Sequence, residues 1–100
     1  MFTSINEIIT LSRENGYSFF DKDRQRQHKT TVLPTLYYGR YFITEQIHEG
    51  KKLYAIYKAL KDGACDIVQG SIFLSQRSAE RHINFYLNDI DYEETTDELQ

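Results

Sequence analysis

The segment that most constrains the fold is residues 37–45, with the sequence Tyr-Tyr-Gly-Arg-Tyr-Phe-Ile-Thr-Glu. A glycine followed by aromatic and β-branched residues is typical of a hairpin turn and its return strand. Successive side chains of a strand point to opposite faces, so Tyr41 and Ile43 should oppose Phe42. We therefore expect the tip of a β-hairpin, followed by a strand that is apolar on both faces.

Residues 31–37 and 40–46 are the two predicted strands of this hairpin. Pro34 lacks a backbone N–H, so the first strand should lie at a sheet edge or contain a bulge. A two-residue loop would need positive φ at Tyr38, which a bulky side chain resists, whereas a three-residue loop needs it only at Gly39. We therefore expect residues 37–39 to form the loop, with Tyr37 and Tyr38 standing clear of the core. This loop pairs Leu36 with Arg40, Thr35 with Tyr41 and Leu33 with Ile43.

Two amphipathic patterns predict helices before and after the strand-forming region. The first helix covers residues 4–15, because Ser4 and Glu7 have capping-box spacing and Asn15-Gly16 is a typical helix end. The second covers residues 77–88 and has Ser75 as its N-cap. Its expected apolar stripe consists of Ala79, Ile83, Tyr86, Leu87 and Ile90.

Two further strands are expected between the hairpin and the second helix. Residues 47–51 predict a turn, and residues 53–61 fit either a helix or a strand, of which we expect the strand. Asp62-Gly63 predicts a second hairpin turn, and Gly70 predicts a bulge in the last strand. The order α-β-β-β-β-α describes one α+β domain over residues 1–90, in which two helices flank a four-stranded antiparallel sheet.

Charge is divided unevenly along the chain. The formal net charge is −3, but residues 1–88 alone carry +3, while residues 89–100 carry six acids and no base. We expect residues 91–100 to form a mobile acidic tail. Cys65 is the single cysteine, which rules out an internal disulfide, and no signal peptide or bilayer-spanning run is present in this sequence. These features indicate a soluble protein of a reducing compartment.

A second feature lies between the first helix and the hairpin. The aromatic residues of segment 17–20 should fold back onto the sheet. Residues 21–29 contain no apolar side chain, and they should form a loop or a short helical turn capped by Asp21. They also hold the densest group of bases in the chain, of which Arg24, Arg26 and Lys29 are candidates for contact with a partner.

No residue set in the chain indicates a catalytic chemistry. The three histidines are scattered and none stands at a metal-ligand spacing from a cysteine or an acid. Cys65 has no base placed beside it in the sequence, and no glycine-rich phosphate loop is present. We therefore expect a protein that is not an enzyme and that uses no cofactor or metal.

Two binding functions remain open. Arg24, Arg26 and Lys29 with the hairpin tyrosines could bind nucleic acid through phosphate contacts and base stacking. The high content of tyrosine, eight residues in 100, instead favours a protein interface. The aromatic residues could equally all belong to the core. The residues expected to contact a partner are Tyr37, Tyr38, Arg40, Arg24, Arg26, Lys29, Asp91, Glu93 and Glu94.

Several short motifs together resemble small single-domain proteins of bacteriophages and other mobile elements. They are Gly16-Tyr17, Phe19-Phe20, Tyr38-Gly39-Arg40-Tyr41-Phe42-Ile43-Thr44, Leu53-Tyr54, Ile56 and the Ser75 to Ile83 helix start. In those proteins Phe-Ile-Thr is commonly followed by Ser-Glu, where this chain has Glu45-Gln46. The resemblance implies an accessory protein in the cytoplasm of a bacterial host. It also implies binding and inhibition of a defence complex such as a CRISPR effector, or of another nucleic-acid-handling protein.

Overall fold

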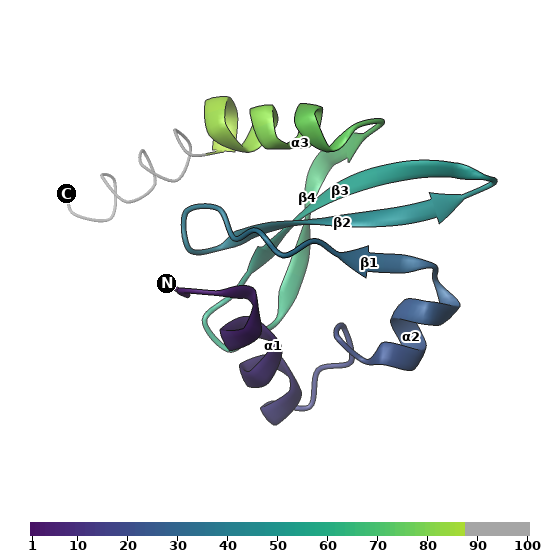
Figure 1. The fold of residues 1–100 in the computed structure, drawn as a ribbon. Coiled ribbons are helices and arrows are strands. Elements are labelled where there is room, and N and C mark those ends of the chain that lie inside the picture. Colours follow the sequence, from purple (N-terminus) through teal and green to yellow (C-terminus); the bar gives the residue numbers. More distant parts are fainter. Residues whose placement is uncertain (88–100) are drawn as a thin grey trace.

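The computed structural model describes residues 1–87 and shows a mixed α+β arrangement (Figure 1). The expected acidic tail at 91–100, Ile90 and the domain boundary at residue 90 lie outside these residues. The elements in chain order are α1 (Ile5–Glu14), α2 (Lys22–Gln27), β1 (Thr30–Val32), β2 (Tyr41–His48), β3 (Lys51–Ala59), β4 (Cys65–Phe73), α3 (Gln76–His82) and a π-helical turn, η1 (Ile83–Leu87). The expected N-terminal helix, four-stranded antiparallel sheet and C-terminal helix are confirmed.

The sheet has the strand order β1-β2-β3-β4 and is covered on both faces, by α1 on one and by α3 on the other (Figure 1). Tyr41 and Ile43 are buried in a cluster with residues of α3 and η1. Phe42, which points to the opposite face, is fully buried in a cluster with α1. The aromatic residues at the start of β2 therefore belong to two cores, one on each side of the sheet.

The segment after α1 completes the second of these cores. Phe19 and Phe20 pack edge to face, with ring centroids 4.9 Å apart, and Phe19 also contacts Tyr57 at 4.8 Å. Phe42 stacks on Tyr57 at 5.8 Å. The prediction that this segment folds back onto the sheet is confirmed for Phe19 and Phe20, whereas Tyr17 stays at the surface and donates its hydroxyl to the Asp62 carboxylate.

The tip of the first hairpin differs from the prediction. Tyr37 and Tyr41 exchange backbone hydrogen bonds of 2.8 and 2.9 Å, so the loop is residues 38–40 and not 37–39. Both Tyr38 and Gly39 have positive φ, at 53° and 69°. The expected pairs Leu36–Arg40 and Thr35–Tyr41 are therefore wrong, although Leu33 does bond Ile43 at 2.9 Å as predicted.

The first strand is also shorter than expected. β1 is an edge strand, as Pro34 suggested, but it ends at Val32 and does not reach residue 37. Pro34 cannot donate a ladder hydrogen bond, and the chain bends at this residue. Pairing resumes at Tyr37 with the register moved by two residues.

The remaining two strands follow the prediction, but β3 begins two residues earlier than expected. Residues 51–59 are a strand, which resolves the helix-or-strand ambiguity, and the turn before it is only Glu49-Gly50. In β4 the pairs Tyr57–Ile67 and Ala55–Ile72 leave four residues, 68–71, opposite the single residue Ile56. Gly70, at φ 75°, lies in this irregularity, so the predicted bulge is confirmed.

The C-terminal helix begins as predicted, with the Ser75 hydroxyl accepting from the backbone N–H of Ser78. Ala79, Ile83 and Leu87 are buried at four-residue spacing. Tyr86 was expected in this stripe but is 63% exposed. The wider turn of η1 explains the difference, because a π-helical turn holds more residues and moves Tyr86 away from the line of Ile83 and Leu87.

Candidate functional site

The two tyrosines of the hairpin tip bind the C-terminal helix. The Tyr37 hydroxyl donates to Glu80 Oε1 at 2.9 Å, and the Tyr38 hydroxyl donates to Asn84 Oδ1 at 2.7 Å. Tyr37 is half-buried against the Tyr41 cluster, and this burial, with the neighbouring Glu80 carboxylate, raises its pKa to about 12. The expectation that both side chains stand clear of the core is therefore wrong for Tyr37, while Tyr38 is partly exposed.

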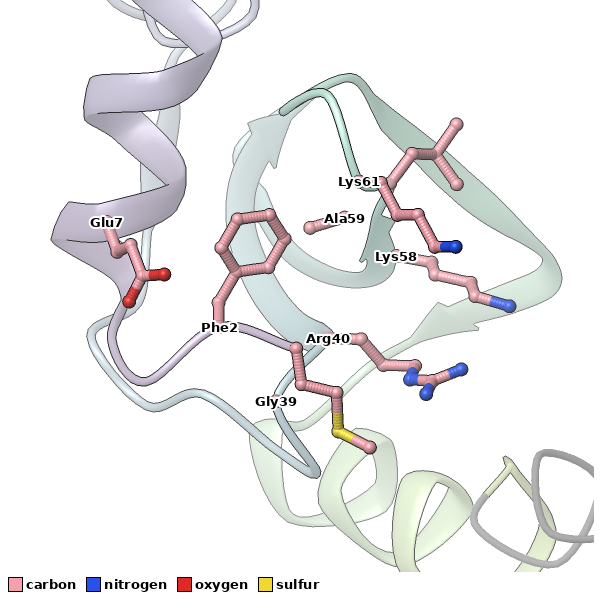
Figure 2. Close-up of a pocket in the computed structure, with 9 residues that line it drawn as sticks. Phe2, Glu7, Gly39, Arg40, Lys58, Ala59 and Lys61 are labelled. Atoms are coloured by element: carbon pink, nitrogen blue, oxygen red, sulfur yellow. The ribbon is translucent and has the colours of Figure 1, made fainter. Parts of the chain in front are cut away.

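Arg40, the last residue of the hairpin loop, lines a pocket of about 350 Å³ (Figure 2). Lys58 and Lys61 contribute two further cations, and the three side chains extend to the same side of Phe2. Met1, Phe2, Ala59 and Leu60 provide its apolar lining. The pocket thus combines a group of positive charges with an apolar surface.

Backbone hydrogen bonds hold the walls of this pocket together. Phe2 N–H donates to Gly39 C=O at 2.9 Å, and Ala59 N–H donates to Arg40 C=O at 2.8 Å. Leu60 N–H donates to Ala64 C=O at 2.7 Å and closes the turn that carries Lys61. The N-terminal residues, the hairpin tip and the end of β3 therefore lie side by side, which the sequence alone did not indicate.

Glu7 of α1 also lines the pocket and lies across Phe2 from the three cations (Figure 2). Its carboxylate accepts hydrogen bonds from the backbone and the hydroxyl of Thr3, at 3.1 and 2.6 Å. These two bonds lower the pKa of Glu7. The expected capping box is thus formed in part, because Ser4 accepts from Glu7 N–H but Glu7 returns its bond to Thr3.

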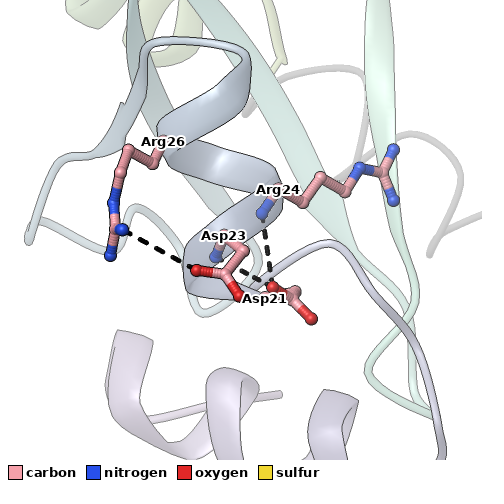
Figure 3. Close-up of polar contacts among 4 residues, drawn as sticks. All are labelled: Asp21, Asp23, Arg24 and Arg26. Atoms are coloured by element: carbon pink, nitrogen blue, oxygen red, sulfur yellow. Dashed lines mark hydrogen bonds and ion pairs between the residues drawn. The ribbon is translucent and has the colours of Figure 1, made fainter.

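The basic segment 21–29 forms the short helix α2 (Figure 3). The Asp21 carboxylate caps it by accepting from the backbone N–H groups of Asp23 and Arg24, at 2.9 and 3.3 Å. Arg24 donates to the Ser18 hydroxyl at 2.6 Å, and Arg26 lies 3.8 Å from Asp23 in an exposed ion pair. The capped helical turn is one of the two forms expected for this segment.

The structure does not bring the predicted contact residues into one site. α2 precedes β1, whose residues pair with Thr44–Gln46, whereas the hairpin tip lies at the Tyr41 end of β2. Arg24, Arg26 and Lys29 therefore lie at the opposite end of the sheet from Tyr37, Tyr38 and Arg40 (Figure 1). The acidic residues Asp91, Glu93 and Glu94 lie outside the described residues.

An exposed apolar surface is formed by η1, α3 and the end of β4, and sequence analysis missed it. We define this η1 surface by five residues that line one hollow, Phe73, Arg81, His82, Phe85 and Tyr86, and exposed Leu74 follows Phe73 in the chain. Leu74, Phe85 and Tyr86 are 80%, 65% and 63% exposed. The His82 ring lies between Phe73 and Tyr86, with centroids 5.3 and 5.2 Å away, at a hollow of about 560 Å³. A signal for it was present, since Phe85 is a large apolar residue outside the predicted apolar stripe of this helix.

Catalytic chemistry finds no support at Cys65. Burial, followed by the charges of Asp66 and Asp62, raises the pKa of the Cys65 thiol to about 12. A reactive cysteine needs the opposite shift. Within residues 1–87 no group of three or more His, Cys, Asp and Glu side chains is arranged to hold a metal ion. None of the helices in the described part of the chain is long and apolar enough to cross a membrane.

No protein-family model, curated protein or solved structure matches this chain.

Proposed function

We propose that this chain is a non-enzymatic binding protein that docks on a bacterial defence complex through the η1 surface and inhibits it. The observation that carries the proposal is that Phe85 and Tyr86 are 65% and 63% exposed and line one hollow of the C-terminal helix. Aromatic residues and arginine dominate the energetics of protein interfaces. Arg81 and His82 at the same hollow give this surface that composition.

The type of target follows from two further features of the sequence. The resemblance to phage accessory proteins favours a host defence complex in the bacterial cytoplasm. The six acids of residues 89–100 are complementary to the basic channels in which RNA-guided effectors hold nucleic acid. A CRISPR-type effector is therefore the proposed partner, with the η1 surface supplying the apolar contact.

The test is an interference assay in cells. The full chain is expressed with an active CRISPR system, and transformation by a targeted plasmid is compared with transformation by a non-targeted one. We expect the chain to restore transformation by the targeted plasmid, and the double variant Phe85→Ser/Tyr86→Ser to lose this effect. The control is Ile47→Ser, which removes an exposed apolar side chain outside the η1 surface.

Binding to the inhibited effector is measured by size-exclusion chromatography with the purified proteins. The unmodified chain and the control variant should bind, and Phe85→Ser/Tyr86→Ser should not. Circular dichroism of each variant separates loss of binding from loss of fold. The proposal is wrong if no defence system in a representative panel is inhibited. It is also wrong if the Phe85→Ser/Tyr86→Ser chain remains folded and as active as the unmodified one.

Nucleic-acid binding by the α2 bases and the hairpin tyrosines is the second candidate function, and the geometry supports it less. The two groups lie at opposite ends of the sheet, and the hydroxyls of both tyrosines are bonded to the C-terminal helix.

A further inference from the structure

We propose that two copies of this chain pair in antiparallel orientation through the outer edge of β4 and form a dimer with one continuous sheet. Within residues 1–87 only β3 pairs with β4, so the other edge of β4 presents backbone N–H and C=O groups for pairing. Such an edge is a template for a further strand. The inference goes beyond the proposed function and does not rest on it, because a second copy is the one partner that it requires.

The two edges of the sheet differ in how well they are protected. β1 has three residues and is followed by a bend at Pro34, and both features hinder pairing with another strand. β4 has nine residues, contains no proline or lysine, and has Asp66 as its single charged residue. Its Ile67 and Ile72 side chains are 50% and 61% exposed. β4 is therefore the edge that is open to pairing.

The apolar residues of β4 are placed to meet those of a second copy. Ile67 and Ile72 point to the same face of the sheet, because their partners in β3, Tyr57 and Ala55, both face the α1 side. Antiparallel pairing about the point between residues 69 and 70 puts Ile67 of each copy opposite Ile72 of the other. Four isoleucines then meet on one face of the joined sheet and shield one another from water.

The bulge in β4 favours a second copy over a regular strand of another protein. Residues 68–71 lie opposite the single residue Ile56, so β4 is longer than a regular strand over this stretch. A regular partner strand would lose register with β4 on one side of the bulge. A second copy brings the same four residues between its own Ile67 and Ile72, so both halves of the seam stay in register.

The charges also fit this arrangement. The pairing places Asp66 of one copy opposite Phe73 of the other, on the face that α3 covers. Phe73 lines a hollow with Arg81, which has no acidic partner among the residues that the structure describes. The two-fold symmetry brings Asp66 to the side of Arg81 twice, once in each copy. The two aspartates themselves lie at opposite ends of the seam, where their mutual repulsion is small.

The experiment is analytical ultracentrifugation of the full chain over a range of concentrations, up to about 1 mM. A seam of one strand is smaller than a standard interface, so we expect a monomer–dimer equilibrium with a Kd on the order of 100 μM. Ile67→Lys/Ile72→Lys should weaken dimerisation by about tenfold or more, because four lysines would replace the isoleucines that meet at the seam. The matched control, Thr31→Lys/Ile47→Lys, adds the same charge at exposed positions of β1 and β2 and should dimerise like the unmodified chain.

A second measurement needs no variant. In a mixture of ¹³C-labelled and unlabelled copies, isotope-filtered NMR should show NOEs between the methyl groups of Ile67 in one copy and Ile72 in the other. The proposal is overturned if the chain stays monomeric at about 1 mM, where a Kd of the expected order gives mostly dimer. It is also overturned if a dimer forms without these NOEs, or if the two double variants, both folded by circular dichroism, weaken it equally. Binding of an extended peptide to β4 of a chain that stays monomeric would likewise exclude the second copy as the occupant.

Discussion

Ser71 satisfies both backbone polar groups of Ile56 across the irregular part of the β3–β4 ladder. Its hydroxyl accepts from Ile56 N–H and donates to Ile56 C=O, each at 3.2 Å. Four residues of β4 lie opposite Ile56 at this point, so the regular ladder cannot supply these partners. Both residues are fully buried, which makes the side chain a substitute for a strand hydrogen bond in the core.

Ser71→Ala should therefore destabilise the protein by about 2 kcal/mol, because it leaves a buried N–H and a buried C=O without partners. Urea unfolding measures the loss. Gln69→Ala, at an exposed position of the same strand, is the control and should change stability by less than about 0.5 kcal/mol. Equal effects of the two substitutions would show that the Ser71 bonds contribute nothing.

Gly63 and Gly50 offer a matched test of close packing between α1 and the β3–β4 turn. Both have positive φ, at 89° and 77°, but a Cβ on Gly63 would lie 2.6 Å from Ser12 N, whereas Gly50 has open space around it. Gly50→Ala should cost about 1–2 kcal/mol through backbone strain alone. Gly63→Ala should cost a further 1–3 kcal/mol or so, because α1 must move away from the turn. Thermal unfolding of both variants gives the difference, and equal costs would contradict the close contact.

Substitutions of Asp21 and Asp23 compare the contribution of a helix cap to stability with that of a surface ion pair (Figure 3). Asp21→Ala removes the side chain that accepts from two backbone N–H groups of α2, and should cost about 1 kcal/mol. Asp23→Ala breaks the exposed pair with Arg26 and removes an acidic side chain from the first turn of α2, and it should cost less than Asp21→Ala. Urea unfolding at low salt tests the order, and a larger loss for Asp23→Ala would refute it.

Tyr37 should make stability depend on alkaline pH. Its folded-state pKa of about 12 lies above the ordinary value of 10.0, so the folded protein holds this proton more tightly than the unfolded chain does. The contribution is complete below pH 10 and is lost as the pH rises from 10 to 12. Tyr37→Phe should therefore show a smaller fall in the free energy of unfolding over this interval. NMR titration of the labelled Tyr37 ring checks the pKa, and a midpoint near 10 would contradict it.

Cys65 should react slowly while the protein is folded. Because burial raises its pKa to about 12, little thiolate is present at pH 8. Alkylation by iodoacetamide, followed by mass spectrometry, should be at least about tenfold slower in the native protein than in urea. Faster reaction in the native protein would indicate an activated thiol and would contradict the raised pKa.

The predictable parts of the fold rest on local chemistry. The caps at Ser4, Asp21 and Ser75 each involve a side chain and a backbone group two or three residues away, so spacing in the sequence reveals them. The alternation of Tyr41, Phe42 and Ile43 also predicted opposite faces correctly. Leu33 and Ile43 were paired correctly although the predicted loop was wrong, because the irregular chain between Pro34 and Tyr37 offsets the two-residue shift at the tip.

The hairpin tip could not be predicted in the same way. Positive φ at Tyr38 is unfavourable locally, but the Tyr38 hydroxyl bonds Asn84, 46 residues away, and Phe2 bonds the Gly39 carbonyl. Contacts between such distant residues can outweigh a local cost of about 1–2 kcal/mol. Tyr86 shows the same limit, because a π-helical turn moves it out of the stripe that regular helix spacing predicts.

The sequence by itself thus determined the order of helices and strands, their caps, the position of the bulge near Gly70 and the two-sided character of β2. Only the tertiary structure decided which residues form a site. It separated Arg24, Arg26 and Lys29 from the hairpin tip, bonded Tyr37 to Glu80, and placed Arg40 beside Lys58 and Lys61. The physical reason is that capping and alternation act over a few residues, whereas a pocket depends on how segments distant in sequence pack together.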